Sequence, residues 1–253
     1  MIKFFRNIRK KLIEQSKFRN YFFYAIGEIL LVVIGILIAL QVGTWNEQRK
    51  LDKQQQLYLM RLLQDNKSDL ETFESEITRL EKNNQTTAKF CELIKDTRIN
   101  DSLLVNSASD FVIYGSLYPR FNPSLATFKD LSSTGNLSLI KDTGLRDSIT
   151  SHYQKYELIK LEFQININWA VPIDAPLFIE TDALKFETNN TAFLFPDESI
   201  TEKAKSLRNN QDLYTRNAAL HYWINRDCIA ILKEMRDKTG AFINLLERHI
   251  NSK

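Results

Sequence analysis

Three features of the sequence predict an all-α fold, with one N-terminal transmembrane helix followed by an extracytoplasmic bundle of about five to six helices. A run of twenty residues at 21–40 carries a single charged side chain. No glycine or proline occurs at 45–113, and the chain holds only seven glycines and five prolines. Apolar residues then recur at intervals of three and four, the period of a helix face. Because barrels and sandwiches need many turn residues, this composition argues against them.

The 253 residues suffice for an anchor and one sizeable domain. We divide the chain into a basic amphipathic cytoplasmic tail at 1–20, a transmembrane helix at 21–42, a long amphipathic helix continuing from the anchor at 43–98, and the remainder of the bundle at 99–253. An irregular loop is expected at 170–200, where prolines and asparagines gather among scattered aromatic residues.

The anchor has the length that a bilayer requires, since ~20 helical residues cross a hydrocarbon core of ~30 Å. Tyr21 and Tyr24 at one end and Trp45 at the other are expected as interfacial anchors, because amphipathic rings prefer the membrane–water boundary. A cleaved signal peptide fits poorly, since the apolar run is too long and no small-x-small cleavage site follows it.

Charge predicts the orientation of the anchor. Seven basic side chains precede it, whereas residues 42–60 hold three. The basic residues expected at the membrane surface are Lys3, Arg6, Arg9, Lys10, Lys11, Lys17 and Arg19. This excess predicts a cytoplasmic N-terminus and a periplasmic domain, in the inner membrane of a bacterium. The tail fits either an amphipathic helix lying on the lipid or an unstructured positive segment. The rest of the chain is near neutral, so the lipid bilayer is an expected partner and nucleic acid is not.

Glu28 is the unusual residue of the anchor, because a carboxyl group inside lipid costs ~2.5–3.5 kcal/mol even on insertion scales. A face with a small-xxx-small pair that lets two helices approach closely comprises Glu28, Val32, Gly35 and Ala39. One interpretation is a helix–helix interface that includes the carboxyl group. The other places Glu28 near the cytoplasmic boundary, where snorkelling basic side chains satisfy it.

A stripe of alternating four- and three-residue steps follows the anchor. It comprises Leu59, Leu63, Asn66, Leu70, Phe73, Ile77, Leu80, Asn84, Thr87, Cys91 and Ile94. Such a stripe predicts a long helix packed along a neighbour, either in a bundle or in a coiled coil between chains.

Shorter helical patterns fill the remainder. Helices are expected at about 101–114, from Asn122–Pro123 to Gly135, from Asp142 or Thr143 to about 169 with Pro172 and Pro176 as stops, and at 202–209. A final long helix follows a cap at Asn210 or Asp212.

The search for chemistry finds no phosphate-binding loop, nucleophile elbow or metal motif, so neither a cofactor nor a metal is expected. His152 and His221 stand beside aromatic residues on helical patterns, where a structural histidine is the commoner case. Ser132 and Ser133 are better explained as helix-end hydroxyls than as nucleophiles. Cys91 and Cys228 fit either one disulfide or two buried thiols.

Two motifs carry a resemblance to a known family. They are the anchor YAIGEILLVVIGILIALQ at 24–41 with Trp45-Asn46-Glu47, and the segment LSSTGNL at 131–137 with Leu139-Ile140 and Leu145-Arg146. The sequence resembles an uncharacterised bacterial family, a domain of unknown function with one N-terminal span and a helical remainder. The resemblance implies a membrane location and supplies no activity.

The expected function is therefore interaction, as a homo-oligomer or an accessory subunit of a membrane complex that associates through its anchor and bundle. Two alternatives stay open: an extracytoplasmic ligand-sensing domain that acts through a recruited partner, and an extracytoplasmic hydrolase using Ser132, Ser133 or His152. The hydrolase would need a histidine within hydrogen-bond reach of a hydroxyl.

Overall fold

The computed structural model describes residues 18–251, which form six α-helices, one π-helix and three 3-10 helices without any strand. The chain divides into two units, Met1–Leu57 and Tyr58–Lys253. The all-helical class predicted from the sequence is therefore confirmed. Cys91 and Cys228 are not bridged.

The first unit consists, in its described part, of the N-terminal portion of helix α2 (Phe18–Lys95). Its large apolar side chains between Phe22 and Val42 are mostly exposed. Within the described residues, α2 is the one helix long and apolar enough to cross a membrane.

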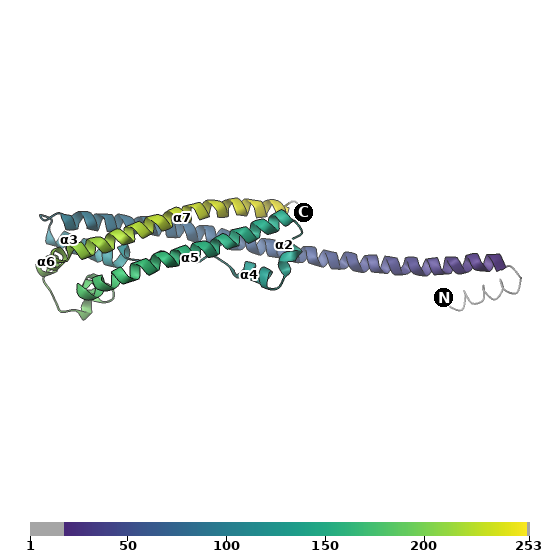
Figure 1. Cartoon of the computed structure of the whole chain (residues 1–253), viewed down its shortest axis with the longest axis horizontal. Helices are drawn as coiled ribbons and strands as arrows, with labels where there is room; N and C mark the ends of the chain where they lie inside the picture. Colours follow the sequence, from purple (N-terminus) through teal and green to yellow (C-terminus); the bar gives the residue numbers. More distant parts are fainter. Residues whose placement is uncertain (1–17, 252–253) are drawn as a thin grey trace. The chain divides into compact units, whose positions relative to one another are not determined.

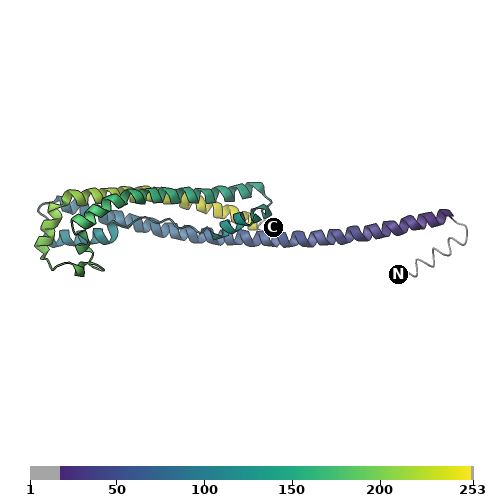
Figure 2. The same cartoon turned by 60° about the horizontal axis from the view of Figure 1, so that its bottom comes forward.

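The second unit is built on three long helices: the later part of α2, α5 (Thr143–Glu180) and α7 (Gln211–Asn251), which run side by side (Figures 1 and 2). Helix α7 is antiparallel to α2, because Lys67 pairs with Glu247 and Glu81 pairs with Lys233. Helix α5 is parallel to α2, because later residues of one helix meet later residues of the other.

Short helices close the two ends of this unit. At one end lie α4 (Ala126–Ser133) and the 3-10 turn η2 (Asn136–Leu139). At the other end lie α3 (Asp101–Asp110), the π-helix η1 (Phe111–Gly115), the 3-10 turns η3 (Ala183–Phe186) and η4 (Ala192–Leu194), and α6 (Ile200–Asn209). Helix α6 begins with a capping box between Ser199 and Glu202.

The four-and-three stripe on α2 faces the interior of its own unit. Leu59, Phe73, Leu80 and Ile94 are buried, and Leu63, Leu70 and Cys91 are half-buried. The stripe is therefore used within the chain, and the open choice between a bundle and an intermolecular coiled coil is resolved in favour of the bundle at this face.

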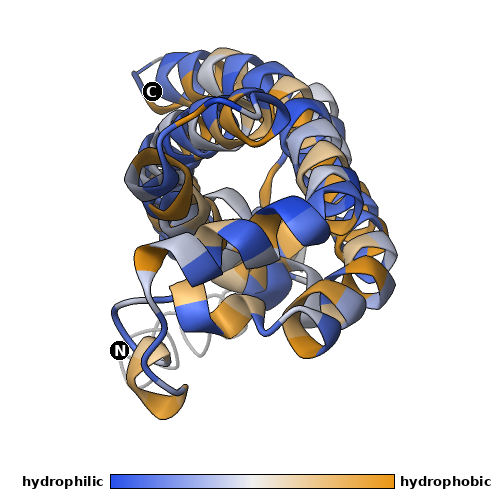
Figure 3. Ribbon diagram, turned by 90° about the vertical axis from the view of Figure 1, so that its left-hand side faces the viewer, coloured by the Kyte–Doolittle hydropathy of each residue, from blue (hydrophilic) through white to orange (hydrophobic). Residues whose placement is uncertain are grey.

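The second unit has two separate hydrophobic cores. The first core draws on α2 from Tyr58 to Leu80, on α5 from Leu145 to Ala170, and on α7 from Ile224 to Leu246. The second core draws on α2 at Phe90 and Ile94, on α5 at Leu177, on α7 at Tyr214 and Ala218, and on α3, η1, η3 and α6. Figure 3 views the unit from the end that carries α3 and α6 and shows hydrophobic and hydrophilic residues alternating around each helix.

The expected stop of the fifth helix at Pro172 is wrong. Helix α5 contains both Pro172 and Pro176 and continues to Glu180. Proline disfavours a helix interior because it lacks an N–H group, but Asp174 and Leu177 are buried beyond the first proline and hold the segment in place. Part of the expected irregular loop at 170–200 is accordingly helix, and irregular chain with two 3-10 turns occupies residues 181–199.

Two further local expectations need correction. Helix α4 begins at Ala126 rather than at Asn122–Pro123, because the backbone N–H of Ser124 donates to Asp69 on α2 and holds this segment outside the helix. The helix expected at 101–114 changes to a π-helix after Asp110. By contrast, Gly135 has a left-handed φ of 75° and Asp142 caps α5, both as predicted.

Candidate functional site

The most unusual feature of the second unit is a cluster of polar side chains between its two cores, all of them buried except the half-buried Tyr118. We call it the polar layer, and it consists of Asn83, Asn84, Thr87, Tyr118, Asp174, Asn217, His221 and Asn225. It occupies an interruption of apolar packing on two long helices, at 81–89 of α2 and 171–176 of α5. On α7 it spans 217–225, where Ala218 belongs to the second core and Leu220 and Ile224 pack in the first.

Asp174 is the centre of this layer. Its Oδ1 lies 2.7 Å from His221 Nε2 and accepts a hydrogen bond of 2.7 Å from Asn217 Nδ2, and its Oδ2 accepts a hydrogen bond from the Tyr118 hydroxyl. Burial by itself raises the pKa of the Asp174 carboxyl. The hydrogen bond and charge of His221, together with the other two hydrogen bonds, outweigh burial and hold this pKa below its usual value.

Other contacts connect helix α2 and the π-helix η1 to the polar layer. Arg79 on α2 donates to the Tyr118 carbonyl at 2.8 Å, and the Tyr118 ring lies 5.8 Å from the His221 ring. Thr87 on α2 approaches the Gly115 carbonyl, at the end of the π-helix, at 3.5 Å. The layer therefore joins all three long helices to η1 and the chain that follows it.

Several polar atoms of the layer have no hydrogen-bond partner among the described residues. They are Asn83 Nδ2, Asn84 Oδ1, Asn217 Oδ1, His221 Nδ1, and both Nδ2 and Oδ1 of Asn225. Each of these residues is more than nine-tenths buried. Because a buried polar atom without a partner costs ~1–3 kcal/mol, the layer is a weakly stabilised level of the bundle.

A second buried polar cluster lies inside the first core, and none of its side-chain atoms is both fully buried and without a hydrogen-bond partner. Asn66 Oδ1 accepts from His152 at 2.8 Å and from Tyr156 at 3.3 Å, while its Nδ2 donates to Tyr153 and to a backbone carbonyl. Tyr156 also lies 3.3 Å from Thr239. Burial lowers the pKa of His152 to about 4, so this imidazole is neutral and donates through Nε2.

The hydrolase alternative finds no support in this arrangement. His152 hydrogen-bonds Asn66, while Ser132 and Ser133 donate to backbone carbonyls of their own helix. His221 pairs with a carboxylate rather than with an aliphatic hydroxyl. Burial raises the pKa of Cys228 to about 12, which leaves an unreactive thiol. No group of three or more metal-binding side chains occurs within the described residues.

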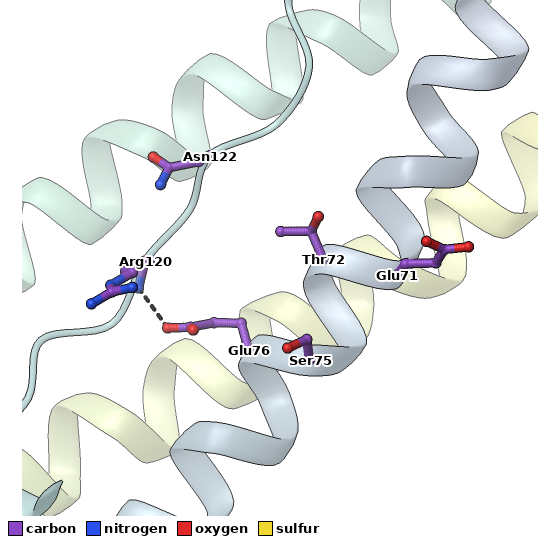
Figure 4. A pocket seen from close by; sticks show the side chains of 6 residues that line it. All are labelled: Glu71, Thr72, Ser75, Glu76, Arg120 and Asn122. Carbon is purple, nitrogen blue, oxygen red and sulfur yellow. Dashed lines mark hydrogen bonds between the residues drawn. The ribbon is translucent and has the colours of Figure 1, made fainter.

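A surface cleft of about 400 Å³ opens between α2 and the chain before α4 (Figure 4). Glu76 lines it and is already engaged, accepting from the Arg120 backbone N–H at 2.7 Å and pairing with Arg79 at 2.5 Å. The other lining residues are Glu71, Thr72, Ser75 and Asn122. The Arg120 side chain is exposed at the rim and is the group that could meet an anion.

An apolar surface lies on the outer face of α5. Leu158, Leu161, Ile165 and Trp169 are 56%, 58%, 46% and 64% exposed, and their spacing places them on one side of the helix. Trp223 of α7 extends this surface, with its ring 6.4 Å from that of Trp169. We call these five residues the α5 surface. The opposite face of α5 supplies the first core, so the helix is apolar on two sides.

The predicted residues of the anchor lie on a helix, as expected. Val32, Gly35 and Ala39 are exposed, Glu28 is half-buried, and no other described atom lies within 4 Å of a Cβ placed on Gly35. Trp45 is exposed, with the Arg49 guanidinium 6.0 Å from its ring. The side chains of the predicted surface residues, Tyr21 and Tyr24 fall outside the described part of the chain.

Sequence reasoning missed the polar layer as a unit. A signal was present on α7, where Asn217, His221 and Asn225 follow one another at four-residue intervals on the face that also carries Ile224 and Cys228. Asp174 was hidden, because two neighbouring prolines indicated a loop there.

The sequence pattern of a family of unknown function, DUF6090, matches residues 28–168. The chain belongs to this family. The matched part includes Glu28, Gly35 and the α5 surface up to Ile165, whereas Asp174 and His221 lie beyond it. No curated protein and no solved structure matches the chain. The family assignment agrees with the resemblance noted in the sequence and brings no activity with it.

Proposed function

We propose that this DUF6090 protein is a single-pass membrane protein that works by protein–protein contact and assembles with further copies of itself. Its N-terminus lies in the cytoplasm of a bacterium and its helical unit lies outside the inner membrane. The apolar length of α2 supports the membrane span. The excess of basic residues before the span supports the orientation.

The α5 surface is the main support for the proposed protein–protein contact. Large apolar side chains that are exposed singly are common on proteins, but a contiguous row of them marks an interaction site. The row contains two tryptophans, a residue type enriched among the side chains that dominate binding energies. The four-and-three stripe of α2 is occupied within the chain, whereas the α5 surface is an apolar helix face of the second unit that is exposed to a partner.

The occupant that we propose is a second copy of the chain. Copies of the chain anchored in one membrane have the same orientation and the same depth. Identical faces of two copies therefore lie at the same height and can meet by diffusion within the membrane plane. The anchor adds a matching feature, because Gly35 and Ala39 form a small-xxx-small pair that allows two helices to approach closely. Leu158, Leu161 and Ile165 repeat at three and four residues, the spacing that pairs one helix with another.

The test is chemical cross-linking of the full chain in native membranes, with substitutions at each surface and a matched control for each. Leu161→Glu places a charge in the α5 surface, and Lys160→Glu places the same charge on the neighbouring exposed position outside it. Gly35→Ile fills the small-xxx-small face, and Gly27→Ile makes the same change about 80° or more away from that face. We expect Leu161→Glu and Gly35→Ile to lower the cross-linked dimer about tenfold, a loss of ~1.4 kcal/mol.

The controls should leave the dimer at its wild-type level. A monomer in wild-type membranes, or equal losses in the control variants, would overturn self-association. Cross-links to another subunit that disappear with Leu161→Glu would assign the surface to an accessory role instead.

A second candidate function is ligand sensing, and the cleft of Figure 4 is the observation that favours it. Arg120, an exposed basic residue, lines this cleft together with Ser75 and Asn122, and a guanidinium group binds small anions. Glu71 and Glu76 at the same cleft oppose an anion, so this candidate stands behind self-association.

A further inference from the structure

The polar layer coincides with several independent weaknesses of the bundle. The first core ends at Leu80 on α2 and at Ala170 on α5, and the second core resumes at Phe90 and Leu177. On α2 and α5 neither core has a residue at this level, whereas on α7 Ala218 of the second core lies close to Leu220 and Ile224 of the first, so the apolar packing is broken on two of the three long helices. A bundle packed continuously would resist bending, because close-packed interiors are stiff.

Helix α5 is weakened at the same level. Pro172 and Pro176 have no N–H group, so the carbonyls of Asn168 and Pro172 lack their usual helical donors. Asp174 stands between the two prolines and faces Asn217 and His221. Asn217 donates to the Ile173 carbonyl at 3.4 Å, a long contact that replaces neither of these two missing donors.

The π-helix η1 adds a third irregularity. It ends at Gly115, where an added Cβ would lie 2.6 Å from the Phe111 ring and 2.7 Å from Thr87 Oγ1, so the chain passes closely across α2 at the layer. Single π-turns interrupt the regular helical hydrogen bonds and recur at functional sites.

We propose that the polar layer is a hinge inside the second unit, about which the part built on the second core reorients relative to the part built on the first core. The paired contacts of Asp174 keep the two parts in register. The unpartnered Oδ1 of Asn84 and the unpartnered Oδ1 and Nδ2 of Asn225 allow the angle to change, because these atoms have no hydrogen bond that must break. The hinge does not rest on self-association, because four of the five residues of the α5 surface lie at 158–169, beside the first core, and only Trp223 lies at the level of the layer.

The hinge is tested by hydrogen exchange in the full chain, held in lipid nanodiscs. Amides at 168–178 of α5 and 217–225 of α7 should exchange about tenfold faster than amides at 149–163 and 228–243, because hinge amides open locally. The double substitution Pro172→Ala and Pro176→Ala restores two backbone hydrogen bonds and should slow exchange at 168–178 about tenfold. Pro196→Ala, in the exposed loop before α6, is the matched control and should change nothing at the layer.

A distance measurement gives a second readout. One pair of spin labels, at Lys160→Cys and Lys205→Cys, spans the layer. The control pair, at Lys160→Cys and Glu71→Cys, lies entirely on the side of the first core. Both pairs are made in a chain in which Cys91→Ala and Cys228→Ala remove the native thiols. The spanning pair should give the broader distribution, and the double proline substitution should narrow it. Equal protection of layer and cores, or equal widths for the two pairs, would overturn the hinge.

Discussion

Two long helices of the bundle each carry a buried histidine. The polar clusters around these histidines differ in how completely their atoms are hydrogen-bonded. Around His152, Nε2 of the imidazole and both amide atoms of Asn66 have hydrogen-bond partners, which include the hydroxyls of Tyr153 and Tyr156. Around His221 the carboxylate of Asp174 is matched, but the second ring nitrogen, the Asn217 Oδ1 atom and both amide atoms of Asn225 are not. A polar cluster whose atoms are hydrogen-bonded favours one packing of the core. A cluster with unpartnered atoms is less stable, so the bundle opens at that level first.

The largest effect expected from this difference is that of Asn66→Ala. The substitution removes the acceptor of the His152 and Tyr156 hydrogen bonds and leaves these donors buried, so the free energy of unfolding should fall by about 3 kcal/mol. The measurement is denaturant unfolding of the full chain in detergent. Asn84→Ala is the matched control on the same stripe, and because the Asn84 carbonyl oxygen has no partner, its cost should stay within about 1 kcal/mol. Equal losses would show that the two clusters do not differ.

The second prediction uses pH. The pKa of His152 is lowered from 6.5 to about 4 by burial, so the unfolded chain binds a proton in a range where the folded chain does not. The contribution of this group to stability is complete above pH 6.5 and is lost progressively as the pH falls to about 4, by up to about 3 kcal/mol.

Thermal unfolding between pH 7 and pH 4 measures this loss. His152→Gln keeps a donor toward Asn66 and removes the titration, so its unfolding temperature should depend less on pH across this window. The same pH dependence in both proteins would assign it to other groups.

The smallest effect concerns the polar layer. Asn225→Leu replaces two unpartnered polar atoms by apolar ones of similar size between Ile224 and Cys228 on α7, and it should raise the free energy of unfolding by about 1 kcal/mol. The unfolding temperature reports the gain. A loss of about 2 kcal/mol would mean that the Asn225 amide is satisfied in the folded protein.

Much of the fold was predictable because local signals and packing agree. The apolar run after Tyr21, the four-and-three stripe on α2, the cap at Asp142 and the left-handed Gly135 each depend on neighbours a few residues away. The structural roles of His152 and His221 followed from their aromatic neighbours in the sequence, although their partners Asn66 and Asp174 did not.

The candidate site was harder to predict, because it depends on residues far apart in the chain. Pro172 and Pro176 indicate a helix end locally, yet contacts of Asp174 with Asn217 and His221 continue the helix through them. The α5 surface was also not predicted. Apolar residues on two faces of one helix indicate a helix buried on both sides, and only the structure shows which face has a partner.

The sequence by itself determined the all-α class, the long apolar segment and most helix limits, since composition, helical periodicity and capping act within one or two turns. Only the tertiary structure decided which apolar stripe is buried, where the two cores stop and which polar atoms face one another between them. The reason is that burial and hydrogen-bond satisfaction belong to pairs of segments brought together by folding, and α2, α5 and α7 meet at the polar layer across more than a hundred residues of chain.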